Sequence, residues 1–113
     1  MSDKLSKEDK EKLINLQRLQ QQVQTLLYQK QTIELDAIEV NNALSEIKKN
    51  NSEEAYQIVG NIMVKKSKGD LIKSLENKKD VLEIRLNSYD KQIKKISNEI
   101  TKLQDELFRK ERK

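Results

Sequence analysis

Apolar residues recur along both halves of the chain at alternating steps of three and four. In the first half, nine of the ten positions are apolar: Leu16, Leu19, Val23, Leu26, Lys30, Ile33, Ala37, Val40, Leu44 and Ile47. In the second half, ten of eleven are apolar: Ile72, Leu75, Lys79, Leu82, Leu86, Tyr89, Ile93, Ile96, Ile100, Leu103 and Leu107. A 3-4 spacing sustained over four or more heptads predicts the seam of a left-handed coiled coil. We therefore expect two long helices.

The two series also match each other in reverse order. The residue numbers of Ile47 and Ile72 add to 119, and so do those of Leu16 and Leu103. One antiparallel register thus places every seam layer opposite another, and we expect the chain to fold back on itself. Seam residues alone do not determine the partner of a coiled coil. Two helices that each pair with another molecule therefore remain the alternative.

Two layers of this register contain a lysine, Lys30 opposite Tyr89 and Lys79 opposite Val40. A lysine stem can lie along an apolar seam while its ammonium group stays in water. Such layers lower stability and disfavour slipped registers. We expect no function of their own for these lysines.

Short polar motifs mark the ends of the helices. Ser6-Lys7-Glu8-Asp9 and Ser67-Lys68-Gly69-Asp70 both resemble capping boxes with Asp in the third helical position. Asn50-Asn51-Ser52 indicates where the first helix stops. These signals predict helices over residues 6–49 and 68–112.

The connection between the helices predicts a β-hairpin over residues 55–66. Ala55-Tyr56-Gln57-Ile58-Val59 and Ile62-Met63-Val64-Lys65-Lys66 are rich in β-formers and bracket Gly60-Asn61. An irregular capping loop is the alternative. The expected fold class is dominated by α structure: a long antiparallel two-helix coiled coil with a short β-hairpin at the bend.

An isolated two-stranded hairpin is marginally stable in water and leaves open edges. This hairpin also has more apolar surface than two strands can hide. We therefore expect hairpins from several subunits to pair edge to edge. The residues expected to take part are Tyr56, Ile58, Val59, Gly60, Ile62, Met63 and Val64.

Composition separates the remaining function classes. Only 35% of the 113 residues are hydrophobic and 37% are charged, which fits either a disordered chain or a helical coiled coil. The periodicity favours the coiled coil. The sequence contains no cysteine and no histidine, so it lacks thiolate ligands and the usual general base. A two-helix layer also has no interior in which to tune a carboxylate or a lysine. We expect no enzyme, no cofactor and no metal site.

Charge and hydropathy limit the partners. The chain carries 23 basic and 19 acidic residues, and residues 1–49 hold eight of each sign. Interleaved charges are typical of a solvated coiled-coil surface rather than of a phosphate-binding stripe. No apolar run approaches the roughly 18 residues of a membrane span. The polar start Met1-Ser2-Asp3-Lys4 leads into no signal peptide. We expect a cytoplasmic protein without nucleic-acid or membrane partners.

The order helix, β-hairpin, helix resembles a prefoldin β subunit. The resemblance is most specific at Tyr56-Gln57-Ile58-Val59-Gly60, because the family carries a Tyr-x-x-Val-Gly segment there, followed by an apolar second strand. Leu75-Glu76-Asn77-Lys78-Lys79 and Leu19-Gln20-Gln21-Gln22-Val23 are also similar to the family. The single short connection is similar to the β class, and the histidine-free, lysine-rich composition looks archaeal-type. The likeness covers almost all of residues 1–113, as a single prefoldin-like domain.

Membership would imply a heterohexamer of two α and four β subunits. The hairpins would form a β-barrel platform from which six coiled coils project. Such a complex binds and stabilises non-native proteins without ATP and delivers them to a group II chaperonin.

Under this resemblance, the ends of the helices farthest from the hairpin are the expected client-binding site. Leu13 with Ile14, and Leu107 with Phe108, are adjacent apolar pairs of which one helix face can bury only one member. The expected client-binding residues are Leu13, Ile14, Leu16, Leu103, Leu107 and Phe108. Ordinary fraying of helix ends is the alternative for Leu107 and Phe108.

Two other functions fit a helical hairpin. One is a structural coiled-coil scaffold that links partners and has no effect on aggregating proteins. The other is a nucleic-acid-binding helical arm, which would need basic residues concentrated along one exposed face. The second half of this chain instead mixes its basic residues with nine acids.

Overall fold

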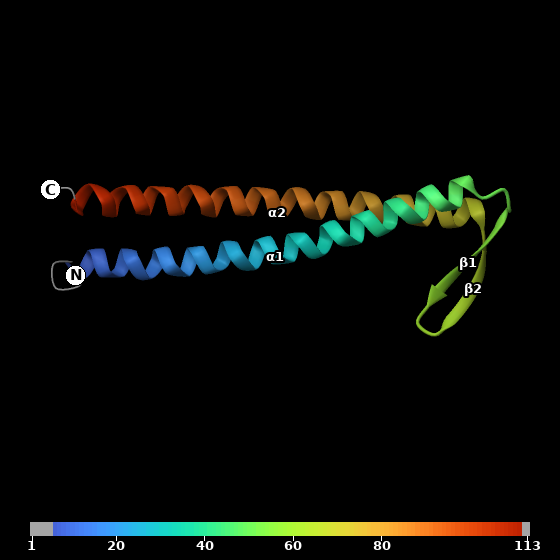
Figure 1. Cartoon of the computed structure of the whole chain (residues 1–113), viewed down its shortest axis with the longest axis horizontal. Helices are drawn as coiled ribbons and strands as arrows, with labels where there is room; N and C mark the ends of the chain where they lie inside the picture. Colours follow the sequence, from blue (N-terminus) through green and yellow to red (C-terminus); the bar gives the residue numbers. More distant parts are fainter. Residues whose placement is uncertain (1–5, 112–113) are drawn as a thin grey trace. The chain divides into compact units, whose positions relative to one another are not determined.

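The chain forms a long helix, then a β-hairpin, then a second long helix. The computed structural model describes residues 6–111. Its elements are α1 (Lys7–Lys49), β1 (Glu54–Val59), β2 (Ile62–Ser67) and α2 (Lys68–Glu111) (Figure 1). The expected fold class, a two-helix coiled coil with a hairpin at the bend, is confirmed. The expected last residue of the second helix, 112, lies outside the described residues.

The chain forms two compact units, which are described separately. The terminal unit contains Met1–Lys30 and Ser88–Lys113, of which residues 6–30 and 88–111 are described. The hairpin unit contains Gln31–Asn87. In each unit a segment of α1 lies beside a segment of α2, and the hairpin belongs to the second unit (Figure 1).

The apolar seam is the core of each unit. None of the 21 seam positions is exposed, although most of their neighbours along the helices are. The best-covered seam residues are Leu16 and Leu19 in the terminal unit, and Ile33, Val40, Leu44 and Leu82 in the hairpin unit. The 3-4 periodicity therefore identified the buried stripe of both helices.

Ion pairs in the terminal unit agree with the antiparallel register. Lys12 Nζ lies 3.3 Å from Glu106 Oε2, and Lys30 Nζ lies 2.7 Å from Asp90 Oδ1. The residue numbers of the two pairs add to 118 and 120, on either side of the 119 expected from the seam. Lys30 thus runs its stem along the seam and meets a carboxylate at its end.

A similar tie occurs in the hairpin unit. There Lys48 Nζ lies 3.5 Å from Glu76 Oε1, so one ion pair again joins α1 to α2. Both side chains are more than half exposed. Surface pairs of this kind contribute at most about 1 kcal/mol each. Burial of the seam, not its ion pairs, therefore dominates the stability of the helices.

The helices begin and end at the expected polar motifs. The Asp9 amide donates to Ser6 Oγ at 3.0 Å, and the Asp70 amide donates to Ser67 Oγ at 3.2 Å. Each serine thus satisfies an amide that has no partner within its helix. After α1 ends, Asn50 Oδ1 accepts from the Ser52 amide at 2.9 Å, which forms the local turn typical of Asn.

The hairpin closes through a two-residue turn. β1 and β2 are antiparallel, and the register runs from Glu54 opposite Ser67 to Val59 opposite Ile62. Gly60 has a φ of +62°, whereas no residue other than glycine has a positive φ among those described. Glycine with positive φ in the first central position is the pattern of a type II′ turn, whose twist suits paired strands.

Because Leu82 lies in the seam of α2 and Ile84 lies outside it, we expect their substitution to change the free energy of unfolding by very different amounts. Leu82 is 5% exposed, whereas Ile84 is 68% exposed. We expect Leu82→Ala to lower the free energy of unfolding by about 2–3 kcal/mol, because it leaves an underpacked layer. Ile84→Ala should change it by less than about 0.5 kcal/mol. Urea unfolding followed by circular dichroism, at equal protomer concentrations, measures both; equal losses would contradict the seam.

Candidate binding surfaces

The hairpin carries an apolar face that the chain does not cover. Residues directly opposite each other in an antiparallel pair share a face, so Ile58 and Met63 lie together beside Tyr56. Ile58 is 72% exposed and Met63 is 66% exposed. Glu54 and Lys65 form an ion pair of 2.9 Å across the same two strands. The expected excess of apolar surface on the hairpin is therefore present in the structure.

The opposite face of the hairpin is better covered near its base. Ala55, Gln57 and Lys66 are half-buried, whereas Val59 and Ile62, which flank the turn, are exposed. A groove of about 600 Å³ runs from Ala55 and Tyr56 to the adjoining helix ends. Its other lining residues are Ala43, Glu46, Ile47, Lys49, Asn50, Leu71 and Leu75. Because both strands also have a free edge, the hairpin offers edges and apolar side chains together.

A second apolar surface lies in the terminal unit. Leu13 and Leu16 of α1 and Gln104, Leu107 and Phe108 of α2 line a groove of about 210 Å³. The structure thus brings four of the six expected client-binding residues to one place. The other two lie elsewhere: Ile14 is exposed outside the groove, and Leu103 lines a neighbouring groove of about 320 Å³.

The seam becomes polar where it borders this groove. Counting back from Leu16 by the same steps of four and three gives Lys12 and Asp9. Asp9 is 7% exposed and Lys12 is half-buried, so both occupy covered positions. Phe108, by contrast, is 56% exposed. The usual arrangement, with apolar residues inside and polar residues outside, is therefore partly inverted at these helix ends.

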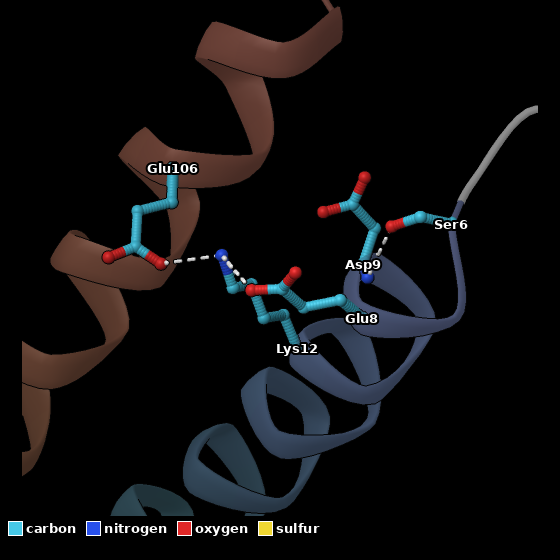
Figure 2. A network of polar contacts seen from close by, with 5 residues as sticks. All are labelled: Ser6, Glu8, Asp9, Lys12 and Glu106. Carbon is cyan, nitrogen blue, oxygen red and sulfur yellow. Dashed lines mark hydrogen bonds and ion pairs between the residues drawn. The ribbon is translucent and has the colours of Figure 1, made fainter.

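Figure 2 shows how the covered lysine is held. Lys12 Nζ contacts Glu106 Oε2 on α2 at 3.3 Å and Glu8 Oε1 on its own helix at 3.7 Å. From the sequence, Lys12 and Glu106 look like surface charges that keep the helix ends in solution. The structure shows instead that they join the two helices. Lys12 could have been found in the sequence by extending the seam spacing one step of four residues from Leu16 toward the N-terminus.

The described residues contain no group of three or more His, Cys, Asp or Glu side chains placed to hold a metal ion. In the same part of the chain, none of the helices has an apolar stretch sufficient to cross a bilayer. What the two surfaces offer is apolar area bordered by charge. Contact with the apolar groups of another molecule is the chemistry that such surfaces support.

Two antiparallel helices joined by a β-hairpin define a class of helical-hairpin protein, and comparisons with known proteins narrow the class. A family model described as prefoldin subunit matches residues 10–111. The chain is 35% identical over 108 residues to a prefoldin subunit beta of Saccharolobus islandicus strain L.S.2.15, covering 95% of this chain and 86% of the relative. It is 39% identical over 93 residues to one of Methanospirillum hungatei, covering 81% and 78%. The chain belongs to the prefoldin family.

Solved structures agree with this assignment. The crystal structure of the prefoldin beta subunit from Thermococcus strain KS-1 matches with a TM-score of 0.85 and 31% identity, covering 90% of each chain. The beta2 subunit from the same strain matches with a TM-score of 0.72 at 22% identity, which supports the fold alone. The resemblance to prefoldin β subunits seen in the sequence is therefore confirmed. Prefoldins are a family of chaperones, and membership implies assembly with other prefoldin subunits.

Proposed function

We propose that this chain is one subunit of an ATP-independent holding chaperone that binds non-native proteins and delivers them to a group II chaperonin. The observation that carries the proposal is the terminal groove lined by Leu13, Leu16 and Phe108. Leu13 and Phe108 stay exposed there, while the adjoining seam positions of α1 are the polar residues Lys12 and Asp9. Exposed apolar patches are expected where a protein binds partners that expose apolar surface themselves.

The size of the groove suits weak contacts with single side chains. Its volume of about 210 Å³ is below the roughly 300–1,000 Å³ that is usual for small-molecule sites. Burial of one large apolar side chain contributes about 1.5–3 kcal/mol. One groove therefore binds a client weakly. Several grooves that hold one client raise its retention by orders of magnitude through effective concentration, and each contact still releases quickly.

Holding a client in this way needs several copies in one assembly. The exposed hairpin residues, Ile58 and Met63 among them, supply a surface through which subunits associate. We propose a heterohexamer in the cytoplasm, with two α-class subunits and four copies of this β-class chain. The likeness to prefoldin β subunits supports this stoichiometry and the transfer to a chaperonin.

Independence from nucleotide agrees with the sequence. Phosphate-binding loops need several glycines that let backbone amides surround the phosphates. This chain has two glycines, Gly60 in the hairpin turn and Gly69 in the first turn of α2. Binding and release of clients then depend on weak apolar contacts and not on a hydrolysis cycle. A scaffold that only links partners would share the fold but would leave aggregating proteins unaffected.

The groove residues predict a measurable loss of client binding. We expect the double variant Leu13→Ser/Phe108→Ser, in a complex with an α-class subunit, to suppress aggregation poorly. Losing even one 1.4 kcal/mol contact raises the required chaperone concentration about tenfold. The assay is light scattering from a chemically denatured client diluted without nucleotide. Ile84→Ser is the control, because Ile84 is also an exposed apolar residue of α2 but lies in the hairpin unit. No suppression by the intact assembly would favour the scaffold.

The hairpin predicts a separate loss of assembly. Ile58→Asp/Met63→Asp places two charges on the exposed apolar face, and burying unpaired charges in an interface is costly. We expect the variant to remain a lone subunit when it is mixed with its α-class partner. Light scattering coupled to size exclusion measures the mass of the complex, with Ile84→Asp as the control. A complex of normal mass from the hairpin variant would show that assembly uses another surface.

A further inference from the structure

The terminal groove has a wall on each helix, and one ion pair joins the walls. Leu13 and Leu16 of α1 form one wall, and Leu107 and Phe108 of α2 form the other. Lys12 precedes Leu13 in the sequence, and Glu106 precedes Leu107. The Lys12–Glu106 pair therefore joins α1 and α2 at residues directly adjacent in sequence to the groove walls, and Figure 2 shows this pair between the two helices.

This pair carries more of the closure than an ordinary surface pair does. Beyond Leu16 the seam positions of α1 are Lys12 and Asp9, so no apolar seam layer from α1 continues toward its first turn. Apolar burial holds the helices together up to Leu16. Past that point the seam positions of α1 are polar, so the Lys12–Glu106 ion pair takes a larger part in holding the helix ends together. Contacts between charges weaken as salt is added. The interactions that hold α1 to α2 are thus weaker at these helix ends than along the rest of the seam.

Lys12 also has a second partner that does not depend on closure. Glu8 lies four residues before it on α1, the favourable order for a Glu–Lys pair on a helix, and its Oε1 is 3.7 Å from Lys12 Nζ. When the contact with Glu106 breaks, Lys12 remains paired with Glu8. Opening therefore leaves no unpaired lysine, which lowers the free-energy cost of breaking the Lys12–Glu106 contact.

We propose that Lys12 is a latch that exchanges between Glu106 and Glu8, and that its release lets the helix ends separate and widen the client groove. Separation exposes Leu16, which is buried while the ends are closed, and more of Leu107. This inference rests on the proposed function of the groove. It adds that client capture depends on ionic strength through one identified pair of side chains.

The latch is tested first without any client. The chain contains no cysteine, so spin labels can be placed at Lys10→Cys and Arg109→Cys, two exposed positions on opposite helices. Pulsed electron–electron double resonance then measures the distance between the two labels, and so the separation of the helix ends, in the assembled complex. We expect Glu106→Gln to raise the population of long distances about two- to five-fold, as for loss of a partly exposed ion pair. Added salt should also raise the population of long distances in the complex that keeps Glu106, and it should change that population little in the Glu106→Gln variant.

Glu76→Gln is the matched control, because it removes the acid of the other interhelical Lys–Glu pair, Lys48–Glu76, in the hairpin unit. It should leave the distances between the labels unchanged. If the unsubstituted and the Glu106→Gln complexes give the same distance distribution between the labels, the proposed latch is wrong. Equal shifts from the Glu106 and Glu76 variants would also overturn it, because the effect would then not be local to the groove.

Client capture is measured on the same complexes. We expect the Glu106→Gln complex to suppress aggregation at about a two- to five-fold lower concentration than the unsubstituted complex, because its grooves are open more often. A shifted distance distribution with unchanged capture would overturn the link between latch and client. If no complex suppresses aggregation while the distances still shift, the proposed holding function fails and the ion-pair exchange itself stands.

Discussion

Burial of one apolar stripe on each helix is the constraint on which the structure depends. Two helices side by side can cover a single seam, and in both units that seam holds nearly all the buried apolar residues, such as Leu19, Ile33 and Leu82. A two-helix layer has no second interior. Apart from Leu71, which is buried at the base of the hairpin, the large apolar residues outside the seam therefore stay in water or must be covered by another molecule.

Among the residues that do not follow the apolar seam, two groups form the candidate binding surfaces. The hairpin exposes Ile58 and Met63 because its two strands cannot cover their own apolar face. At the other end of each helix, Lys12 takes a covered position while Phe108 stays exposed. In a protein that acted alone, both features would only cost stability and solubility. The chain belongs to a chaperone family whose subunits assemble, and we propose that the first feature is a surface for subunits and the second a surface for clients.

The seam and the hairpin could be predicted because their signals are local. All 21 positions that the 3-4 spacing predicted for the seam are covered, and Gly60-Asn61 located the turn, with each strand one residue longer at its outer end than expected. Leu71 was missed as a core residue. It is buried, yet it is not a seam position, and it lines the groove shared with Ala55 and Tyr56 at the hairpin base. Contacts between the hairpin and the helices do not follow the heptad spacing, so the apolar periodicity of the sequence does not reveal them.

The candidate client site could be predicted only in part for a related reason. Adjacent apolar pairs identified Leu13 and Phe108, and four of the six expected residues line one groove. The Lys12–Glu106 pair was missed because charged residues at a helix end are usually solvated, and their pairing depends on the antiparallel register. Patterns within one helix can thus be predicted from the sequence, whereas the pairing of polar residues on two helices can be seen only in the structure.

Site-specific photocrosslinking tests the central claim most directly, because it reports where a non-native protein touches the assembled complex. A benzophenone-bearing residue is placed at position 108 in the groove or at position 84 on the exposed outer face of α2, and a denatured client is added before illumination. We expect abundant client crosslinks from position 108 and few from position 84, and few from either position when the added protein is native. Equal crosslinking from both positions, or none from position 108 while clients remain soluble, would contradict it.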